Sequence, residues 1–139
     1  MGNLVMVIDD SLTVRKIMET SLKREGFNAI SFPDGLQAMQ ALARGEVPVP
    51  DLILLDVGLP KMDGYEVARA FKQKSRLGNT VIIMLTGRDG MFDKLRGRMA
   101  GAKEYITKPF KPAEVIAVVR TYVHSEPPAV AFSQQYSYR

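Results

Sequence analysis

Short apolar runs alternate with stretches of helical periodicity along the chain, and this alternation predicts the fold. Five runs have the length and composition of buried strands, at residues 4–8, 28–32, 52–55, 81–85 and 104–106. Apolar residues at helical spacing predict helices from about Ser11 to Gly26, over 36–43, over 65–74, around Phe92 to Met99, and over about 112–123. Nearly continuous apolar strands between helices are typical of a parallel sheet with helices on both faces. The pattern therefore predicts one α/β domain.

Composition excludes several classes of protein. At 139 residues, with 46% hydrophobic and 24% charged side chains, the chain suits one globular domain. It has no cysteine and one histidine, His124, which argues against disulfide frameworks, zinc sites and Ser-His catalysis. No apolar run approaches the ~20 residues that span a bilayer, and the start of the chain does not resemble a secretion signal. We therefore expect a cytoplasmic protein without membrane insertion, with a domain over 1–124 and a flexible tail over 125–139.

The charge balance leaves two interpretations open. Lys and Arg number 19 against 15 Asp and Glu, which gives a net charge of +4. This charge fits an ordinary mixed surface, or attraction to an acidic partner or nucleic acid. The basic residues are scattered apart from Lys94, Arg96 and Arg98, and the chain has no recognised nucleic-acid-binding motif. We therefore expect no direct binding to DNA.

Polar or reactive residues follow four of the five predicted strands at once. Asp9 and Asp10 follow the first strand, Asp56 the third, Thr86 the fourth and Lys108 the fifth. Taken singly, each has a structural alternative as a helix cap, a turn residue or a solvated lysine. In a parallel sheet, however, all five lie at the carboxyl edge, which is where ligands bind in open α/β folds.

The chemistry of this set indicates a cation and a phosphate. Three gathered carboxylates repel one another unless a cation is present, and oxygen ligands without histidine or cysteine favour Mg²⁺ or Mn²⁺ over zinc. Lys108 offers a positive charge to a phosphoryl oxygen, and Thr86 offers a hydroxyl donor. A carboxylate can also accept a phosphoryl group itself.

With these residues in view, positions 4–123 resemble the receiver domain of two-component response regulators. The motifs are Asp9-Asp10, Asp56 within Leu-Leu-Asp-Val-Gly-Leu-Pro-Lys-Met-Asp-Gly, Thr86, and Lys108-Pro109-Phe110. The resemblance implies a flavodoxin-like (βα)5 fold, a doubly wound parallel sheet with strand order 2-1-3-4-5. It also implies a signalling domain that catalyses no reaction beyond its own phosphorylation and dephosphorylation.

The resemblance further implies a role for each residue at the acidic edge. Asp56 would accept a phosphoryl group from a sensor histidine kinase or a phosphotransfer protein. Asp10 and Asp56 would ligate Mg²⁺, with Asp9 helping through water and Gly58 supplying a backbone carbonyl. Lys108 would pair with the acid first and with the phosphoryl oxygen afterwards.

A conformational switch is also implied. Thr86 and Tyr105 would turn inward together, and the Lys108–Pro109 peptide would be cis. The surface of the fourth predicted helix, the fifth strand and the last helix would then change its affinity for a downstream protein or for a second copy of the chain. Apolar residues of the last helix fit either such a surface or ordinary core packing. They are Val115, Ile116, Val119 and Tyr122.

Three positions bear on how long the phosphoryl group would persist. Gly58 and Gly87 are smaller than the residues common in the family at these places, which leaves the site accessible. Arg88 lies two residues after Thr86 and could reach across the site, with an effect opposite to that of the open space.

A narrower resemblance is to single-domain regulators of chemotaxis-like systems that control twitching motility. It rests on residues 5–11, 13–15, 19–20, 23–26, 90–94 and 96–98. Two other functions stay open on the sequence. One is a Mg²⁺-dependent aspartyl phosphatase or phosphotransferase, although the acid follows the third strand and no cap domain is visible. The other is a receiver-like binding module that acts without phosphorylation.

Overall fold

A computed structural model describes residues 3–58, 64–87 and 100–125 of the chain. Its elements run in the order β1 (Leu4–Ile8), α1 (Leu12–Arg24), β2 (Asn28–Phe32), α2 (Gly35–Ala43), β3 (Leu52–Asp56), α3 (Gly64–Lys72), the 3-10 helix η1 (Ser75–Leu77), β4 (Val81–Thr86), β5 (Glu104–Thr107) and α5 (Pro112–Tyr122). The predicted helix around Phe92 to Met99, the basic residues Lys94, Arg96 and Arg98, Arg88, and all but the first residue of the predicted tail lie outside the described residues.

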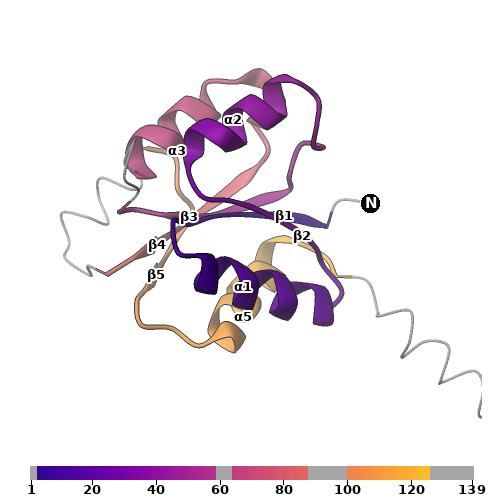
Figure 1. Cartoon of the computed structure of the whole chain (residues 1–139), viewed down its shortest axis with the longest axis vertical. Coiled ribbons are helices and arrows are strands. Elements are labelled where there is room, and N and C mark those ends of the chain that lie inside the picture. Colours follow the sequence, from indigo (N-terminus) through magenta and orange to yellow (C-terminus); the bar gives the residue numbers. More distant parts are fainter. Residues whose placement is uncertain (1–2, 59–63, 88–99, 126–139) are drawn as a thin grey trace, which may run out of the picture.

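The five strands form one parallel sheet in the order β2-β1-β3-β4-β5, which confirms the predicted topology. Helices α2 and α3 cover one face of the sheet, and α1 and α5 cover the other (Figure 1). Because every strand runs the same way, the carboxyl ends of all five reach a single edge.

The alternation of side chains along each strand divides the core into two layers. On β1, Val5 and Val7 pack in the layer beneath α1 and α5, whereas Met6 and Ile8 pack beneath α2 and α3. All five residues of β3 are buried, as expected for a central strand covered on both faces.

Most apolar positions of α1 and α2 are buried or partly buried as their helical spacing predicts, but each helix also leaves an apolar side chain exposed. On α1, Met18 is buried, but Ile17 is 47% exposed. On α2, Leu36 is 47% exposed, and small residues such as Ala38 face the sheet instead. On α2 the reason is the close approach of α3, because a Cβ on Gly35 would lie 2.5 Å from a methyl carbon of Val67.

The apolar residues of α5 belong to the core, which decides between the two interpretations left open for them. Val115, Ile116 and Val119 are at most 5% exposed and pack beneath the sheet. Tyr122 is partly buried there, and its hydroxyl donates a hydrogen bond to Glu104 Oε2 at 2.7 Å. These residues therefore do not form an exposed apolar surface for a partner.

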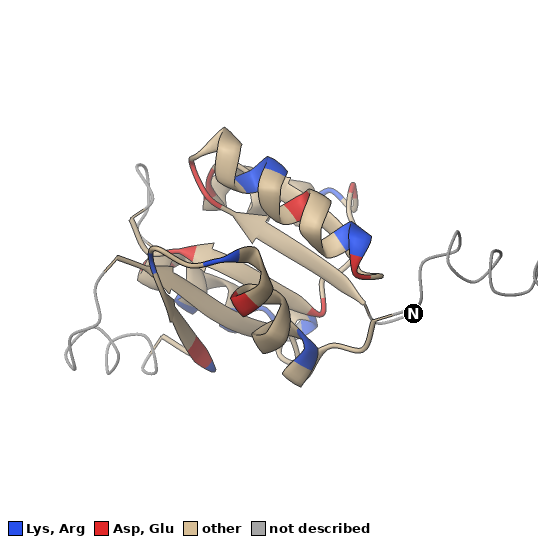
Figure 2. Cartoon of the chain, turned by 90° about the horizontal axis from the view of Figure 1, so that it is seen from below, with Lys and Arg blue, Asp and Glu red and all other residues tan. Residues whose placement is uncertain are grey.

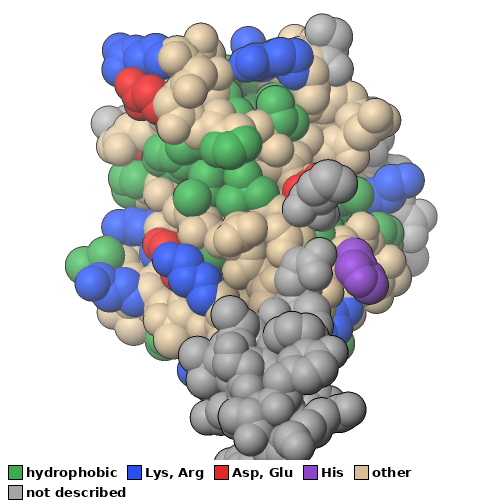
Figure 3. Space-filling view, turned by 90° about the vertical axis from the view of Figure 1, so that its right-hand side faces the viewer, with side chains coloured by type: hydrophobic (Ala, Val, Ile, Leu, Met, Phe, Trp, Pro, Cys, Tyr) green, Lys and Arg blue, Asp and Glu red, His purple; other side chains and the backbone are tan. Residues whose placement is uncertain are grey.

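The described surface carries charges of both signs. Acidic and basic residues are interspersed over the helices (Figure 2), as the mixed-surface interpretation predicts. Hydrophobic side chains gather between basic ones on the side where β1 begins (Figure 3), away from the carboxyl edge. Among the residues described, no helix combines the length and the apolar character that crossing a bilayer requires.

The start of α3 is pressed against the end of β3. The backbone N–H of Gly64 donates to the carbonyl of Val57 at 2.9 Å, and a Cβ on Gly64 would lie 2.5 Å from the carbonyl oxygen of Asp56. Glycine is needed here for close approach of two backbone segments. The contact fixes where the chain returns after the third strand.

We expect Gly64→Ala to lower the free energy of unfolding by about 1–3 kcal/mol, because a methyl group cannot enter this contact without moving backbone. Urea denaturation gives the value. Gly58→Ala is the matched control, because no described residue has an atom within 4 Å of a Cβ built at that position. It should change stability by no more than ~0.5 kcal/mol. Equal stability of the two variants would contradict the steric argument.

Candidate functional site

The residues that the sequence places after the strands converge at the carboxyl edge of the sheet. Asp9, Asp56 and Thr86 are buried, with relative exposures of 0%, 6% and 2%. Asp10 is exposed at the rim. Lys108 reaches in from the end of β5 with its side chain 33% exposed. The site therefore has a buried floor and an open mouth.

Asp9 is held by the turn that leads from β1 into α1. Its Oδ1 accepts a hydrogen bond from the backbone N–H of Ser11 at 2.9 Å, and its carbonyl accepts one from the guanidinium of Arg15 at 2.7 Å. Ser11 in turn caps α1, since its hydroxyl accepts from the N–H of Val14 at 3.2 Å. The helix cap and the acid are thus positioned by the same turn.

Asp56 ends β3, where its carboxylate meets two donors. Oδ1 accepts a hydrogen bond from the backbone N–H of Gly58 at 3.2 Å and lies 3.2 Å from Nζ of Lys108. The next residue, Val57, still pairs with β4 through Leu85 at 3.0 Å. The acid is therefore fixed by backbone on both sides.

Lys108 joins the two buried acids. Its Nζ lies 3.4 Å from Asp9 Oδ2 and 3.2 Å from Asp56 Oδ1. Its own N–H donates to the carbonyl of Thr86 at 2.6 Å, and the Lys108–Pro109 peptide is cis, the isomer that the resemblance implies. One ammonium group thus balances charge on carboxylates from two strands.

The electrostatics of the site follow from burial and crowding. Burial raises the pKa of Asp9, and the neighbouring Asp56 carboxylate raises it further, against the opposing hydrogen bond from Ser11 and the charge of Lys108. Burial alone would lower the pKa of Lys108, but the charges of Asp56 and Asp9 outweigh it and the net pKa is raised. Lys108 therefore stays protonated and is a single positive charge beside a cluster of three carboxyl groups.

The acidic cluster has the geometry to hold a metal ion. Carboxylate oxygens of Asp9, Asp10 and Asp56 all lie within 4.8 Å of one another. These are hard oxygen donors with one exposed member, which suits an octahedral cation that keeps several waters. The donor set therefore fits Mg²⁺ or Mn²⁺.

The residues expected to switch lie on the side of the sheet facing α3. Thr86 is buried at the end of β4, and Tyr105 on β5 is partly buried. The hydroxyl of Tyr105 lies 3.4 Å from that of Tyr65, at the start of α3. Sequence reasoning missed Tyr65, because one tyrosine on an apolar helix face gives no sign of a partner on a distant strand.

Space around the site is open at the two glycines. Among the described residues, no atom lies within 4 Å of a Cβ built on Gly58 or on Gly87, so in this part of the chain the small residues leave space at the site. Arg88 lies outside the described residues. The space expected beside Gly58 and Gly87 is therefore present among the described residues, and the reach of the Arg88 guanidinium across the site stays a prediction.

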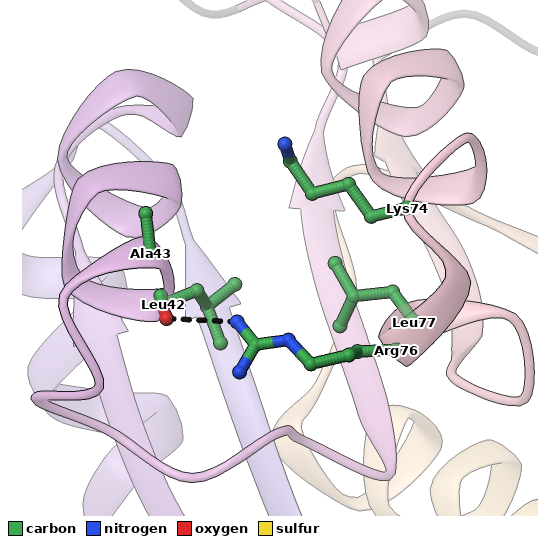
Figure 4. A pocket seen from close by; sticks show the side chains of 5 residues that line it. All are labelled: Leu42, Ala43, Lys74, Arg76 and Leu77. Carbon is green, nitrogen blue, oxygen red and sulfur yellow. Dashed lines mark hydrogen bonds between the residues drawn. The ribbon is translucent and has the colours of Figure 1, made fainter.

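A separate pocket of about 300 Å³ lies between the end of α2 and η1. It is lined by Leu42, Ala43, Lys74, Arg76 and Leu77, and the guanidinium of Arg76 donates to the carbonyl of Leu42 at 2.9 Å (Figure 4). The lining contains no carboxylate, hydroxyl or imidazole. It lacks the groups that a metal ion or a phosphoryl acceptor needs, so the strand-end cluster is the candidate site.

We expect Asp9→Asn to stabilise the metal-free protein by roughly 1 kcal/mol at pH 7, because it removes a buried charge beside Asp56. Since the folded-state pKa of Asp9 is raised above its ordinary value of 3.8, ionisation costs stability as the pH rises through that raised pKa. The higher stability of Asp9→Asn should therefore disappear when the pH falls below the ordinary pKa of 3.8. Urea denaturation across this pH range measures the difference.

Asp51→Asn is the control for this experiment. Asp51 also accepts a backbone hydrogen bond, from Leu4 at 2.8 Å, but lies at the opposite edge of the sheet. Asp51→Asn should give no stabilisation at pH 7. We also expect Mg²⁺ to raise the melting temperature of the wild-type protein, and Asp51→Asn should keep this rise, whereas Asp9→Asn should reduce it. A destabilised Asp9→Asn at pH 7 would refute the charge-crowding argument.

Comparisons with known proteins agree with this geometry. The family model described as the response regulator receiver domain matches residues 5–120. Protein PilG of Pseudomonas aeruginosa is 39% identical over 132 residues, which cover 95% of this chain and 96% of PilG. Among solved structures, the chemotaxis protein CheY4 of Vibrio cholerae is similar with a TM-score of 0.79 and 29% identity, covering 88% of this chain and 99% of CheY4.

A further solved structure is the receiver domain of the sensor histidine kinase PA1611 from P. aeruginosa, which has a magnesium ion coordinated in its active site cleft. It is similar with a TM-score of 0.73 and 28% identity, covering 88% of this chain and 98% of that one. The fold, the strand-end cluster and the family match over most of the chain agree. The chain belongs to the response regulator receiver domain family, whose members are signalling domains of two-component systems.

Proposed function

We propose that the chain receives a phosphoryl group on Asp56 and passes the signal on by binding another protein. The observation that carries this proposal is the position of Lys108, whose ammonium lies 3.2 Å from Asp56 and 3.4 Å from Asp9. A lysine placed on the acceptor before the reaction can move to an oxygen of the incoming group after it. The donor would be a histidine kinase or a phosphotransfer protein, in the cytoplasm.

Asp10 and Asp56 are the residues that would ligate Mg²⁺ directly, with the carbonyl of Gly58 as a further ligand and Asp9 acting through water. When bound, Mg²⁺ supplies positive charge that neutralises the oxygens of the transferring phosphoryl group. Asp10 lies exposed at the rim, which leaves it accessible to a hydrated ion. The buried Asp9 supplies negative charge behind the ligands and is oriented by Ser11.

The transfer itself needs little covalent chemistry from the protein. A carboxylate oxygen of Asp56 attacks the phosphorus of a phosphohistidine, the new P–O bond forms, and the P–N bond breaks with its electron pair returning to the imidazole. Lys108 then pairs with a phosphoryl oxygen. The hydrogen bond from Gly58 keeps the attacking carboxylate aligned.

The added phosphoryl group would act as the switch. It brings negative charge and acceptor oxygens to a site where the Thr86 hydroxyl can donate to it. Inward movement of Thr86 and Tyr105 would then alter the surface around β5 and α5, which binds the downstream protein or a second copy of the chain. Because the apolar residues of α5 are buried, polar groups and the edge of β5 would carry the recognition there.

The pathway we propose is a chemotaxis-like one, in the branch that controls twitching motility. Support comes from the sequence segments that resemble regulators of that branch and from 39% identity to PilG over nearly the full length of both chains. The family match over residues 5–120 supports a receiver over an aspartyl phosphatase. It leaves the phosphorylation-independent module as the alternative to test.

Incubation with Mg²⁺ and acetyl phosphate should add the mass of one phosphoryl group to the intact protein, and Asp56→Asn should abolish the gain. Mass spectrometry of the intact chain reads the result. Asp51→Asn, which alters a hydrogen-bonded acid far from the cluster, should still take up the group.

Phosphate release is followed in the same tube. No mass gain and no phosphate release from the folded wild-type chain would favour the phosphorylation-independent module. Steady release without a mass gain would instead show that the phosphoryl group forms and hydrolyses quickly.

A further inference from the structure

The hydroxyl groups of Tyr65 and Tyr105 lie 3.4 Å apart, within hydrogen-bonding distance. Tyr65 is 2% exposed in the core layer beneath α2 and α3, and Tyr105 is partly buried against the same layer. The two residues are 40 positions apart in sequence and come from a helix and a strand. Their contact is therefore a tertiary link between α3 and β5.

Tyr65 is tied to the proposed phosphoacceptor through the backbone. It follows Gly64, whose backbone N–H donates a hydrogen bond to the carbonyl of Val57. A Cβ built on Gly64 would lie 2.5 Å from the carbonyl oxygen of Asp56. A helix that starts under such a contact has little freedom to shift. The Tyr65 hydroxyl is thus held at a defined position relative to Asp56.

Tyr105 is placed beside Thr86 by strand register. Met84 pairs with Tyr105, and Thr86 pairs with Thr107, in the parallel ladder between β4 and β5. Because side chains alternate along a strand, Thr86 and Tyr105 project from the same face of the sheet. That face is the one α3 covers (Figure 1).

The hydrogen bond between Tyr65 and Tyr105 favours one conformer of the Tyr105 side chain over the other. A hydrogen bond lowers the free energy of the conformer in which it forms, so the bond to Tyr65 favours the Tyr105 conformer turned toward α3 over one turned to solvent. We propose that the Tyr65 hydroxyl is a docking point for Tyr105, so that α3 stabilises the inward conformer before any phosphoryl group arrives. This inference rests on the proposed function, in which the conformation of Tyr105 is coupled to phosphorylation of Asp56.

Thermodynamic linkage limits how much this hydrogen bond can change the affinity of the site for a phosphoryl group. If the phosphorylated site prefers the inward conformer, an interaction present in that conformer alone raises the affinity of the site for the phosphoryl group. The effect cannot exceed the strength of the bond itself. One hydrogen bond amounts to about fivefold in an equilibrium constant.

The test uses Tyr65→Phe, which removes the hydroxyl and keeps the ring. The probe is beryllofluoride with Mg²⁺, a stand-in for the phosphoryl group, titrated into the full chain labelled with 3-fluorotyrosine and followed by fluorine NMR. The Tyr105 resonance is identified by its loss in Tyr105→Phe. In Tyr65→Phe we expect this resonance to move toward the solvent-exposed position without ligand, and the half-saturating beryllofluoride concentration to rise about fivefold.

Tyr122→Phe is the matched control, because the Tyr122 hydroxyl also bonds β5, through Glu104 at 2.7 Å, but in the other core layer. It should change the beryllofluoride affinity by less than about twofold. In a Tyr105→Phe background, removal of the Tyr65 hydroxyl should have a clearly smaller effect on the beryllofluoride affinity, because the hydrogen bond between the two hydroxyl groups is already missing.

Two results would overturn the docking role. One is a Tyr105 resonance that does not move in ligand-free Tyr65→Phe. The other is a loss of beryllofluoride affinity on Tyr65→Phe that is as large in the Tyr105→Phe background as in the wild-type chain. A wild-type chain that binds no beryllofluoride would count against the proposed function instead, and the ligand-free resonance would still decide the docking role.

Discussion

The ammonium group of Lys108 between the carboxylates of Asp9 and Asp56 is the interaction on which the arrangement of the site depends. Two buried acids so close together would repel one another, and burial already raises the pKa of Asp9. A single cation relieves part of that repulsion in a cluster that contains a third carboxyl group, that of the exposed Asp10. The site is consequently stable enough to exist without a ligand and still has reason to bind a divalent cation. One acid follows β1, the other ends β3 and the lysine follows β5, so this charge balance depends on the parallel sheet that brings the three strand ends to one edge.

Much of the fold follows from local pattern in the sequence. Apolar runs such as 52–55 predict the central strands because nothing but a position covered on both faces tolerates them, and the parallel order then brings Asp9, Asp56, Thr86 and Lys108 to one edge. Residue type alone indicates a hard cation there. The helix boundaries are also close to prediction, since Ser11 and Gly26 mark the ends of α1 through capping and a positive φ of 91°.

What the sequence does not predict depends on contacts between distant elements. The exposure of Leu36 results from how closely α2 and α3 approach at Gly35 and Val67, and helical spacing contains no information on that distance. The burial of Val115 and Val119 depends on where α5 crosses the sheet. The pairing of Tyr65 with Tyr105 requires both strand register and the position of α3. Each of these is a matter of packing between elements, which the periodicity of one element cannot encode.

The pairing of Lys108 with Asp9 spans 99 residues of sequence, and this separation has a consequence for how the site assembles. Lys108 follows β5, so a chain that ends before β5 has the acids but lacks their counter-charge. Closing a loop of this length costs entropy that is recovered when β5 joins β4. The charge balance of the site is therefore complete only once β5 has joined the sheet beside β4.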